Sequence, residues 1–279
     1  MKVKKLHIGP AGVPKDGPWK SYEDAIPGLA ENKLDAIEVE FVHGVRMSLD
    51  RAEEIGKIAR KHGVLLTAHA PYYINLNAIE KSKREKSKWR ILKTAEVLDA
   101  MGGYSVVFHP GYYLGMPKND VYRNIERELK DLMKKIRAKG YEVWIRPELM
   151  GKPSQFGSLE EIVKLAENIE GVLPTIDFAH AHARSIGKYN TKEEWREMLS
   201  FIEDRLGRDA LDNMHIHLSD IEYTLKGEKR HVPLDNNTIN WRDLLNVLRE
   251  FRVKGVIICE SPQMYTDALK IAEHYRKKK

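Results

Sequence analysis

The chain has 279 residues, of which 42% are hydrophobic and 32% charged, a balance typical of a globular protein and not of a disordered one. Its single cysteine, Cys259, excludes an intrachain disulfide and a cluster of thiolate metal ligands. No apolar run approaches the roughly 20 residues of a membrane helix, and the first apolar stretch is too short for a signal peptide. We therefore expect a cytoplasmic protein, and its net charge of +6 fits a polyanionic partner such as nucleic acid.

Apolar runs rich in β-branched residues alternate along the chain with longer charged segments of helical period. Strands are predicted over 5–10, 36–41, 64–70, 105–110, 142–149, 173–180, 213–220 and 255–262. Helices are predicted near 20–32, 47–61, 82–101, 119–139, 158–168, 191–206, 241–251 and 264–276. Ser48, Ser158 and Thr191 are the expected N-caps of three helices, and Glu194 completes a capping box with Thr191.

Eight strand–helix units predict a parallel α/β sheet covered by helices, and eight strands close a (β/α)8 TIM barrel of about 250 residues. The alternative is an open doubly wound sheet, which normally carries a Gly-rich phosphate loop after an early strand. No such loop occurs in the sequence. We expect one TIM-barrel domain over residues 1–279, with a frayed basic tail at 276–279 and an active site at the carboxyl ends of the strands.

Histidines and carboxylates gather at these predicted strand ends. The histidines there are His69, His109, His180, His182, His215, His217 and His231, and the main carboxylates are Glu148, Asp177 and Glu260. A lone histidine is usually a hydrogen-bonded packing residue, but so many polar groups at one barrel mouth need a compensating cation or a strong polar network. Imidazole and carboxylate are ligands of zinc, manganese and iron. More than four candidates indicate more than one metal, and paired metals suit hydrolysis of phosphate esters.

Two pairs of residues need separate treatment. Asp177 and His180 are three residues apart, so one turn after a strand can present both, with His182 as the spare. His215 and His217 share one face of a strand because side chains alternate with a period of two. We take His217 as the ligand, and His215 as an interior residue that supports it.

Seven motifs in order carry a family resemblance: HAPYYINL, FHPG, PELMGKPSQFGSLEEI, IDFAHAHA, HLSD, RHVPL and ESP. With them the chain resembles the endonuclease IV family, the metal-dependent apurinic/apyrimidinic endonucleases of base-excision repair within the xylose-isomerase-like TIM-barrel superfamily. The resemblance implies cleavage of double-stranded DNA on the 5′ side of an abasic site. It also implies that Tyr72 enters the DNA at the lesion and that Arg46 contacts DNA from the loop after the second strand.

The resemblance further implies three zinc ions at the barrel mouth, with manganese as the alternative metal and no organic cofactor. The first ion would be held by His69, His109 and Glu148. Glu148 would bridge to the second, completed by Asp177, His217 and Glu260, and would be central to catalysis. His180 and His231 would serve the third. We expect the protein to act as a monomer.

One position departs from the family pattern. Lys229 stands where the family has an aspartate ligand of the third metal. Either the third site is empty and Lys229 supplies positive charge to the phosphate, or a nearby acid such as Asp220 or Asp235 replaces the aspartate. We favour the first, and therefore expect two tightly bound ions and a weakly held or absent third.

The competing interpretation is a single-metal sugar isomerase or epimerase of the same superfamily. Its ligand set matches Glu148, Asp177, His217 and Glu260, so these four residues cannot separate the two activities. His69, His109, His180 and His231 can, because an isomerase does not need them. Another metal-dependent phosphoesterase and a non-catalytic nucleic-acid-binding protein are the remaining alternatives.

Overall fold

Eight strands form the wall of a barrel in the computed structural model, which describes residues 3–277. They are β1 (Leu6–Pro10), β2 (Ala36–Glu40), β3 (Leu65–His69), β4 (Ser105–Phe108), β6 (Trp144–Pro147), β8 (Thr175–Asp177), β9 (Met214–Leu218) and β12 (Gly255–Cys259). Nearly every residue of these strands is buried. This burial explains why the strands appear in the sequence as almost continuous apolar runs.

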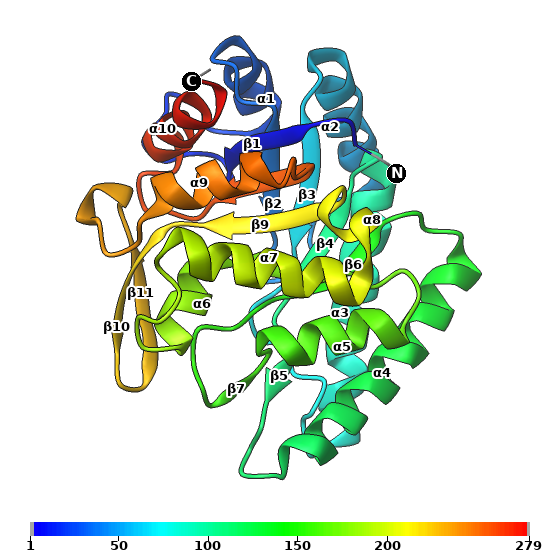
Figure 1. Cartoon of the computed structure of the whole chain (residues 1–279). Coiled ribbons are helices and arrows are strands. Elements are labelled where there is room, and N and C mark those ends of the chain that lie inside the picture. Colours follow the sequence, from blue (N-terminus) through cyan, green and yellow to red (C-terminus); the bar gives the residue numbers. More distant parts are fainter. Residues whose placement is uncertain (1–2, 278–279) are drawn as a thin grey trace.

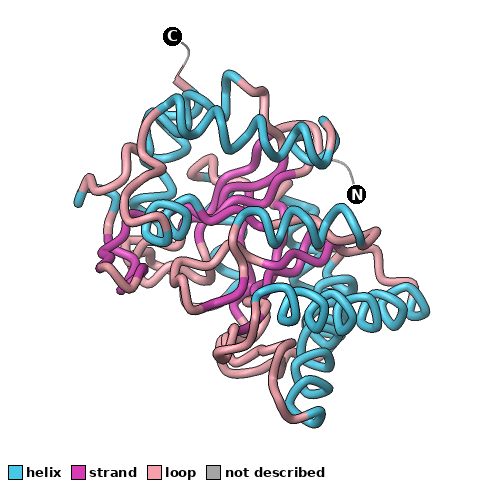
Figure 2. The backbone as a smooth tube through the Cα atoms, turned by 60° about the horizontal axis from the view of Figure 1, so that its bottom comes forward, coloured by secondary structure: helices cyan, strands magenta, loops and turns pink. Residues whose placement is uncertain are grey.

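The strands pair in parallel in two runs, β2-β3-β4-β6 and β8-β9-β12-β1. Isolated parallel bridges join the runs at both seams, Ala11 to Glu38 and Glu148 to Thr175. The ring is therefore closed, as Figures 1 and 2 show from two sides. The predicted TIM barrel is confirmed, and the open doubly wound sheet is excluded.

Eight helices surround the strands (Figure 2). They are α1 (Tyr22–Glu31), α2 (Leu49–His62), α3 (Lys81–Met101), α4 (Lys118–Lys139), α5 (Leu159–Asn168), α7 (Lys192–Leu206), α9 (Trp241–Glu250) and α10 (Met264–Arg276). Ser48, Ser158 and Thr191 cap α2, α5 and α7 as predicted, and Glu194 closes the capping box of α7. The loops at the carboxyl ends of the strands are thereby held on a rigid frame.

Several short elements decorate the barrel. They are the antiparallel pair β5 (Gly111–Tyr112) and β7 (Gln155–Phe156), the helices α6 (Phe178–Arg184), α8 (Arg208–Leu211) and η1 (Leu234–Asn236), and the hairpin of β10 (Asp220–Thr224) and β11 (Gly227–Val232). Helix α6 shortens the strand predicted over 173–180. It begins there because the Asp177 side chain accepts a hydrogen bond from the His180 amide at 2.7 Å and caps the helix.

The expected frayed tail at 276–279 lies partly outside the described residues. Arg276 is the last residue of α10, donates to the carbonyl of Lys33 and lies 3.3 Å from a carboxylate oxygen of Asp35. Residues 278–279 lie outside the described part of the chain. Within residues 3–277, no helix is both long and apolar enough to cross a membrane.

Candidate metal centre

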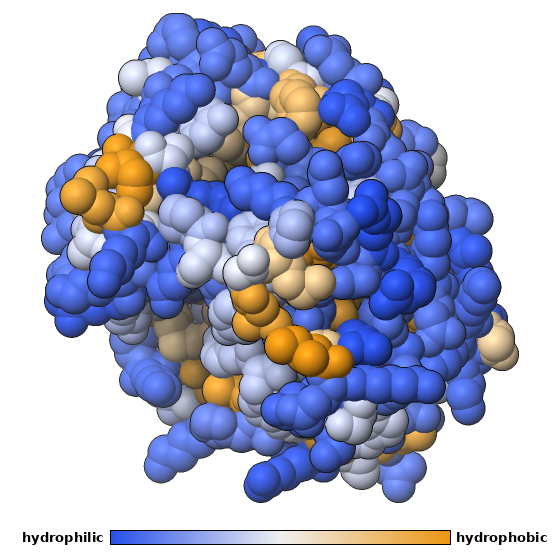
Figure 3. Space-filling view, turned by 90° about the horizontal axis from the view of Figure 1, so that it is seen from below, coloured by the Kyte–Doolittle hydropathy of each residue, from blue (hydrophilic) through white to orange (hydrophobic). Residues whose placement is uncertain are grey.

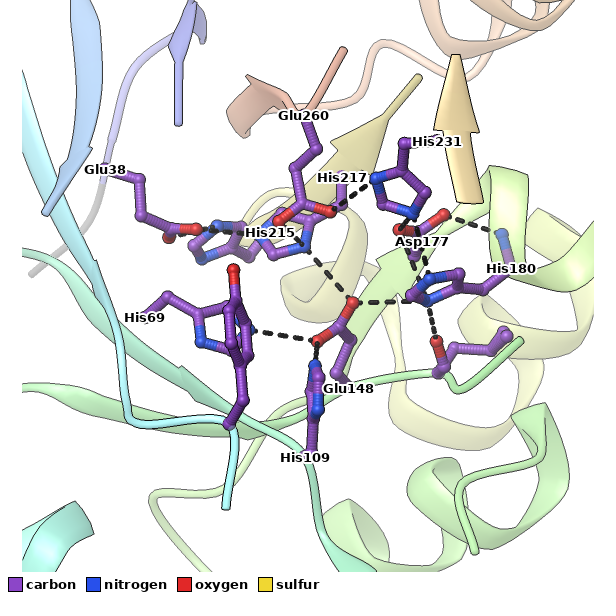
Figure 4. Close-up of polar contacts among 12 residues, drawn as sticks. Glu38, His69, His109, Glu148, Asp177, His180, His215, His217, His231 and Glu260 are labelled. Carbon is purple, nitrogen blue, oxygen red and sulfur yellow. Dashed lines mark hydrogen bonds and ion pairs between the residues drawn. The ribbon is translucent and has the colours of Figure 1, made fainter. Parts of the chain in front are cut away.

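A cavity of about 900 Å³ opens at the carboxyl ends of the strands. Its wall includes His109, Glu148, His180, His231 and Glu260. His69, Asp177 and His217 lie deeper, each at most 1% exposed. The structure therefore brings all eight predicted ligands together at one end of the barrel, in the arrangement drawn in Figure 4.

Glu148 is the hub of this arrangement. One carboxylate oxygen lies 3.2 Å from Nε2 of His69 and 3.1 Å from Nε2 of His109. The other lies 3.3 Å from Nδ1 of both His180 and His217. A carboxylate with imidazoles on both oxygens is placed to bridge two ions, as predicted for Glu148.

Protons balance the charges of this buried cluster when no metal is bound. Burial opposes ionisation of Glu148, but His109, His180 and His217 outweigh it and hold its pKa well below the ordinary value. Burial likewise disfavours a charged His69, yet the hydrogen bond to Glu148 raises the pKa of His69 to about 10. Metal ions bind deprotonated imidazole, so they would replace these protons.

A second group of ligands surrounds Asp177. Glu148, Asp177, His217 and Glu260 each place one ligand atom within 4.8 Å of the others. The Oδ2 atom of Asp177 is buried and has no hydrogen-bond partner, and burial raises the pKa of Asp177 to about 6. An orphaned carboxylate oxygen among imidazoles is the environment that a bound cation would satisfy.

A third group joins the same carboxylate to the hairpin. The Nε2 atoms of His180 and His231 face each other at 3.1 Å, and Asp177 Oδ2 lies 4.0 Å from His231 Nε2. His180 Nδ1 lies 2.9 Å from the carbonyl of Leu149 and can donate its proton to it. That bond leaves Nε2 of His180 free to bind a metal.

Lys229 does not take part in this group. Its ammonium lies 3.1 Å from Glu222 and its side chain is 61% exposed. The expectation that Lys229 presents its charge to a substrate is therefore wrong. Asp220 and Asp235 are not substitutes either, because Asp220 accepts from backbone amides of Ile221, Thr238 and Ile239 and Asp235 pairs with Lys270.

Glu228 is the acid that reaches the third group. In the hairpin, Glu222 pairs with Arg230 but Tyr223 pairs with Glu228, so Lys229 is the extra residue of a β-bulge. A bulge shifts the side-chain alternation by one residue, and Glu228 thereby lines the cavity with Oε2 3.5 Å from His180 Nε2. The family resemblance pointed to position 229, two residues before His231, and the bulge could not be seen in the sequence.

The approach of Glu228 depends on Gly151 in the loop after β6. The Glu228 amide donates to the Gly151 carbonyl at 3.0 Å, which fastens the hairpin to that loop. A Cβ on Gly151 would lie 2.6 Å from Cβ of Glu228 and 2.9 Å from Cδ2 of His180. Only glycine leaves room for both side chains.

The comparison with protein families decides where the chain belongs. A model described as xylose isomerase-like TIM barrel matches residues 28–278. The chain belongs to the xylose isomerase-like TIM barrel family. It is 42% identical to the uncharacterized protein MJ0133 of Methanocaldococcus jannaschii over 97% of both chains.

Two kinds of protein are similar to this chain. The chain is 28% identical to the probable endonuclease 4 of Aquifex aeolicus, over 65% of this chain and 64% of that protein. Among solved structures it is similar to a D-tagatose 3-epimerase-like protein, with a TM-score of 0.73, 19% identity and 96% and 95% coverage. Endonuclease IV from Thermus thermophilus gives a TM-score of 0.69, 17% identity and 98% coverage of both chains. At such identities these structures support the fold alone.

Two acids missed in the sequence belong to this end of the family's barrel. Glu38 and Glu40 lie on β2, and Glu38 is fully buried and hydrogen-bonded to His217. Glu40 lines the cavity, and burial raises its pKa to about 8. The signal in the sequence was two acids with a period of two inside the apolar run AIEVEF, which places both on the same face of β2.

The residues predicted to contact DNA lie in different places. Tyr72 lines the cavity, with its ring stacked on His109 at 5.3 Å and its hydroxyl 3.4 Å from Glu40. Arg46 is exposed and is not among the residues that line the cavity. His182 is buried and faces the carbonyl of Tyr189, away from the three groups, as the spare histidine should.

Proposed function

We propose that this chain is a metal-dependent endonuclease that cleaves double-stranded DNA on the 5′ side of an abasic site. The observation that carries the proposal is that, of the five groups of potential ligands among the described residues, three are linked through Glu148 and Asp177 at one end of the barrel. A single-metal enzyme needs only one such group. Several adjacent metals suit in-line displacement at a phosphodiester, where both the attacking and the leaving oxygen need stabilisation.

The metals that fit these ligands are zinc or manganese, and when bound they would supply Lewis acidity and a nucleophilic hydroxide. His69, His109 and Glu148 would hold the first ion, and Asp177, His217 and Glu260 would hold the second with Glu148. His180 and His231 would hold a third with Asp177, helped by Glu228.

The surroundings of the cavity suit an anionic substrate. Lys15 and Lys152 line its wall, and the whole chain carries a net charge of +6. The face of the molecule seen from below is mainly hydrophilic, with separate hydrophobic patches (Figure 3). Positive charge beside a polar surface favours encounter with a phosphate backbone. The likeness to a probable endonuclease 4 supports the same substrate.

A sugar epimerase is the second candidate. Glu148, Asp177, His217 and Glu260 alone form a four-ligand group, and the fold is similar to that of a D-tagatose 3-epimerase-like protein. Such a single-metal enzyme does not need His69 and His109 beside Glu148, nor a carboxylate that bridges two ions. The contacts of Glu148 with both histidines therefore favour the nuclease.

The test offers the purified protein a duplex with one abasic site, an undamaged duplex, and the ketose D-tagatose. We expect incision of the abasic duplex only, its loss after chelation, and its recovery with zinc or manganese. Epimerised ketose without incision would instead establish the second candidate. Incision that resists chelation would contradict the metal-dependent mechanism.

A further inference from the structure

The buried carboxylate of Glu38 lies beneath the proposed metal centre and outside its three groups of ligands. One oxygen lies 3.0 Å from Nε2 of His217. The other accepts from the Thr67 hydroxyl at 2.7 Å and lies 3.2 Å from Nε2 of His215. Glu38 is fully buried and does not line the cavity. A charge so deep in the barrel is tolerated only because both oxygens have partners.

His217 is oriented differently from two other proposed ligands. His69 and His180 turn Nδ1 toward backbone carbonyls, at 2.7 Å and 2.9 Å, which leaves Nε2 for a metal. His217 instead turns Nδ1 toward Glu148 and Glu260, both at 3.3 Å. Its Nε2 must then keep the proton, and the group that accepts this proton is a carboxylate rather than a carbonyl.

We infer that Glu38 is the positioning residue of the metal centre: it fixes the ring of His217 and holds the proton on Nε2, so that Nδ1 is free to bind metal. A carboxylate behind a ligating histidine orients the ring and makes it a stronger ligand, and its loss typically weakens metal binding about 10- to 100-fold. The inference rests on the proposed metal centre but not on the identity of the substrate.

His215 lies beside His217, with the ring centroids 5.1 Å apart, and faces the other oxygen of Glu38 (Figure 4). Its Nε2 lies 3.2 Å from Glu38, and its Nδ1 lies 2.7 Å from the Ser105 hydroxyl. Contacts thus run from Ser105 through His215 and Glu38 to His217, with hydrogen bonds at the two ends and a 3.2 Å approach of His215 Nε2 to Glu38 between them. This explains why two histidines with a period of two stand on β9 although only one reaches the mouth.

The variant Glu38→Gln tests the inference, because it keeps the shape of the side chain and removes its charge. We expect zinc affinity, measured by competition with a chelator, to fall about 10- to 100-fold, with the number of ions at saturating zinc unchanged. Thr67→Val is the matched control: it removes one hydrogen bond to the same carboxylate and should weaken zinc binding less. Unaltered zinc affinity in Glu38→Gln would overturn the inference, and so would the loss of one ion at saturation, since Glu38 would then be a ligand.

A second measurement needs no variant. In the zinc-loaded natural chain, labelled with ¹⁵N at histidine, the spectrum of His217 should show a protonated Nε2 and a metal-bound Nδ1. The opposite tautomer would contradict the inference even if Glu38→Gln does not fold. Both readouts are independent of DNA cleavage, so a protein that binds zinc as expected but does not incise DNA would refute only the proposed function.

Discussion

Glu148 contacts proposed ligands from all three groups of the metal centre. Four imidazole nitrogens lie within 3.3 Å of its two oxygens. Only a side chain with two equivalent acceptor atoms can face imidazoles on both sides, and an amide cannot, since one of its two atoms is a donor. The position of Glu148 at the mouth was predictable because the barrel directs strand ends to a common point, whereas its proposed bridging role came from the family resemblance.

Replacing Glu148 by Gln should be the most damaging single change to the metal centre. Two groups of ligands lose their shared charge, so the metal content per chain should fall. The incision rate should fall by more than the roughly 10- to 100-fold expected for a supporting residue. Elemental analysis beside a rate measurement checks this. Glu128→Gln, which removes a buried carboxylate paired with Lys88 at 2.8 Å outside the centre, is the control. Full metal content and a near-normal rate in Glu148→Gln would refute the bridge.

Tyr72 should contribute preference for the lesion rather than affinity for DNA in general. An aromatic ring can wedge into a duplex where a base is missing, whereas the salt dependence of binding comes from phosphate contacts. Tyr72→Ala should narrow the ratio of abasic to intact DNA affinity and leave the salt slope nearly unchanged. The neighbouring Tyr73, which is 51% exposed and lies under the guanidinium of Arg90, provides a matched control. An unchanged ratio would leave Tyr72 as a packing partner of His109.

At the scale of elements, apolar runs located the strands and helices to within a few residues. Capping residues added the helix starts, because a serine or threonine followed by a glutamate satisfies the free amides of the first turn. The β10–β11 hairpin was not predicted, and neither was its bulge. One extra residue reverses which side chains face the cavity, so that Glu228, and not Lys229, approaches His180.

Variants of the hairpin can distinguish the roles of its neighbouring residues Glu228 and Lys229. If Glu228 completes the third group, Glu228→Gln should lower the tightly bound metal by up to one ion per chain, because an amide neither carries charge nor replaces a carboxylate well. Lys229→Ala should leave the metal content unchanged, since Lys229 pairs with Glu222 on the outside of the hairpin. Metal counts after mild dialysis measure both. Equal counts in Glu228→Gln and the natural chain would show that the third site does not use Glu228.

On the scale of the whole molecule, closing the barrel is what gathers distant residues into one site. Glu38 and His217 are 179 positions apart, yet they touch because β2 and β9 both face the barrel interior. Sequence patterns predicted the barrel and its polar mouth, since both follow from strand ends. They could not predict the supporting layer beneath the mouth, because which interior side chains meet depends on the stagger of the strands around the closed ring.

The charges gathered by this closure should make the metal-free protein less stable as pH rises from 6.5 to 8. His69 has its pKa raised from 6.5 to about 10, so the stability it contributes is complete below pH 6.5 and declines above it. Glu40 has its pKa raised from 4.5 to about 8, so between these pH values the folded state keeps a proton that the unfolded state has lost, and stability falls as pH rises. Glu260 and His215, with pKa values lowered to about 2 and about 4, affect stability only below this range.

Thermal unfolding of the chelated protein at several pH values between 6.5 and 8 measures this effect. For each proton that the folded state holds and the unfolded state does not, the free energy of unfolding falls by about 1.4 kcal/mol per pH unit. The unfolding midpoint should therefore fall steadily. Zinc replaces these protons, and the zinc-loaded protein should therefore show a weaker dependence and a larger gain from zinc at pH 8 than at pH 6.5. An unfolding midpoint that stays level or rises with pH in the metal-free protein would show that protons bound to these buried groups do not stabilise the folded state.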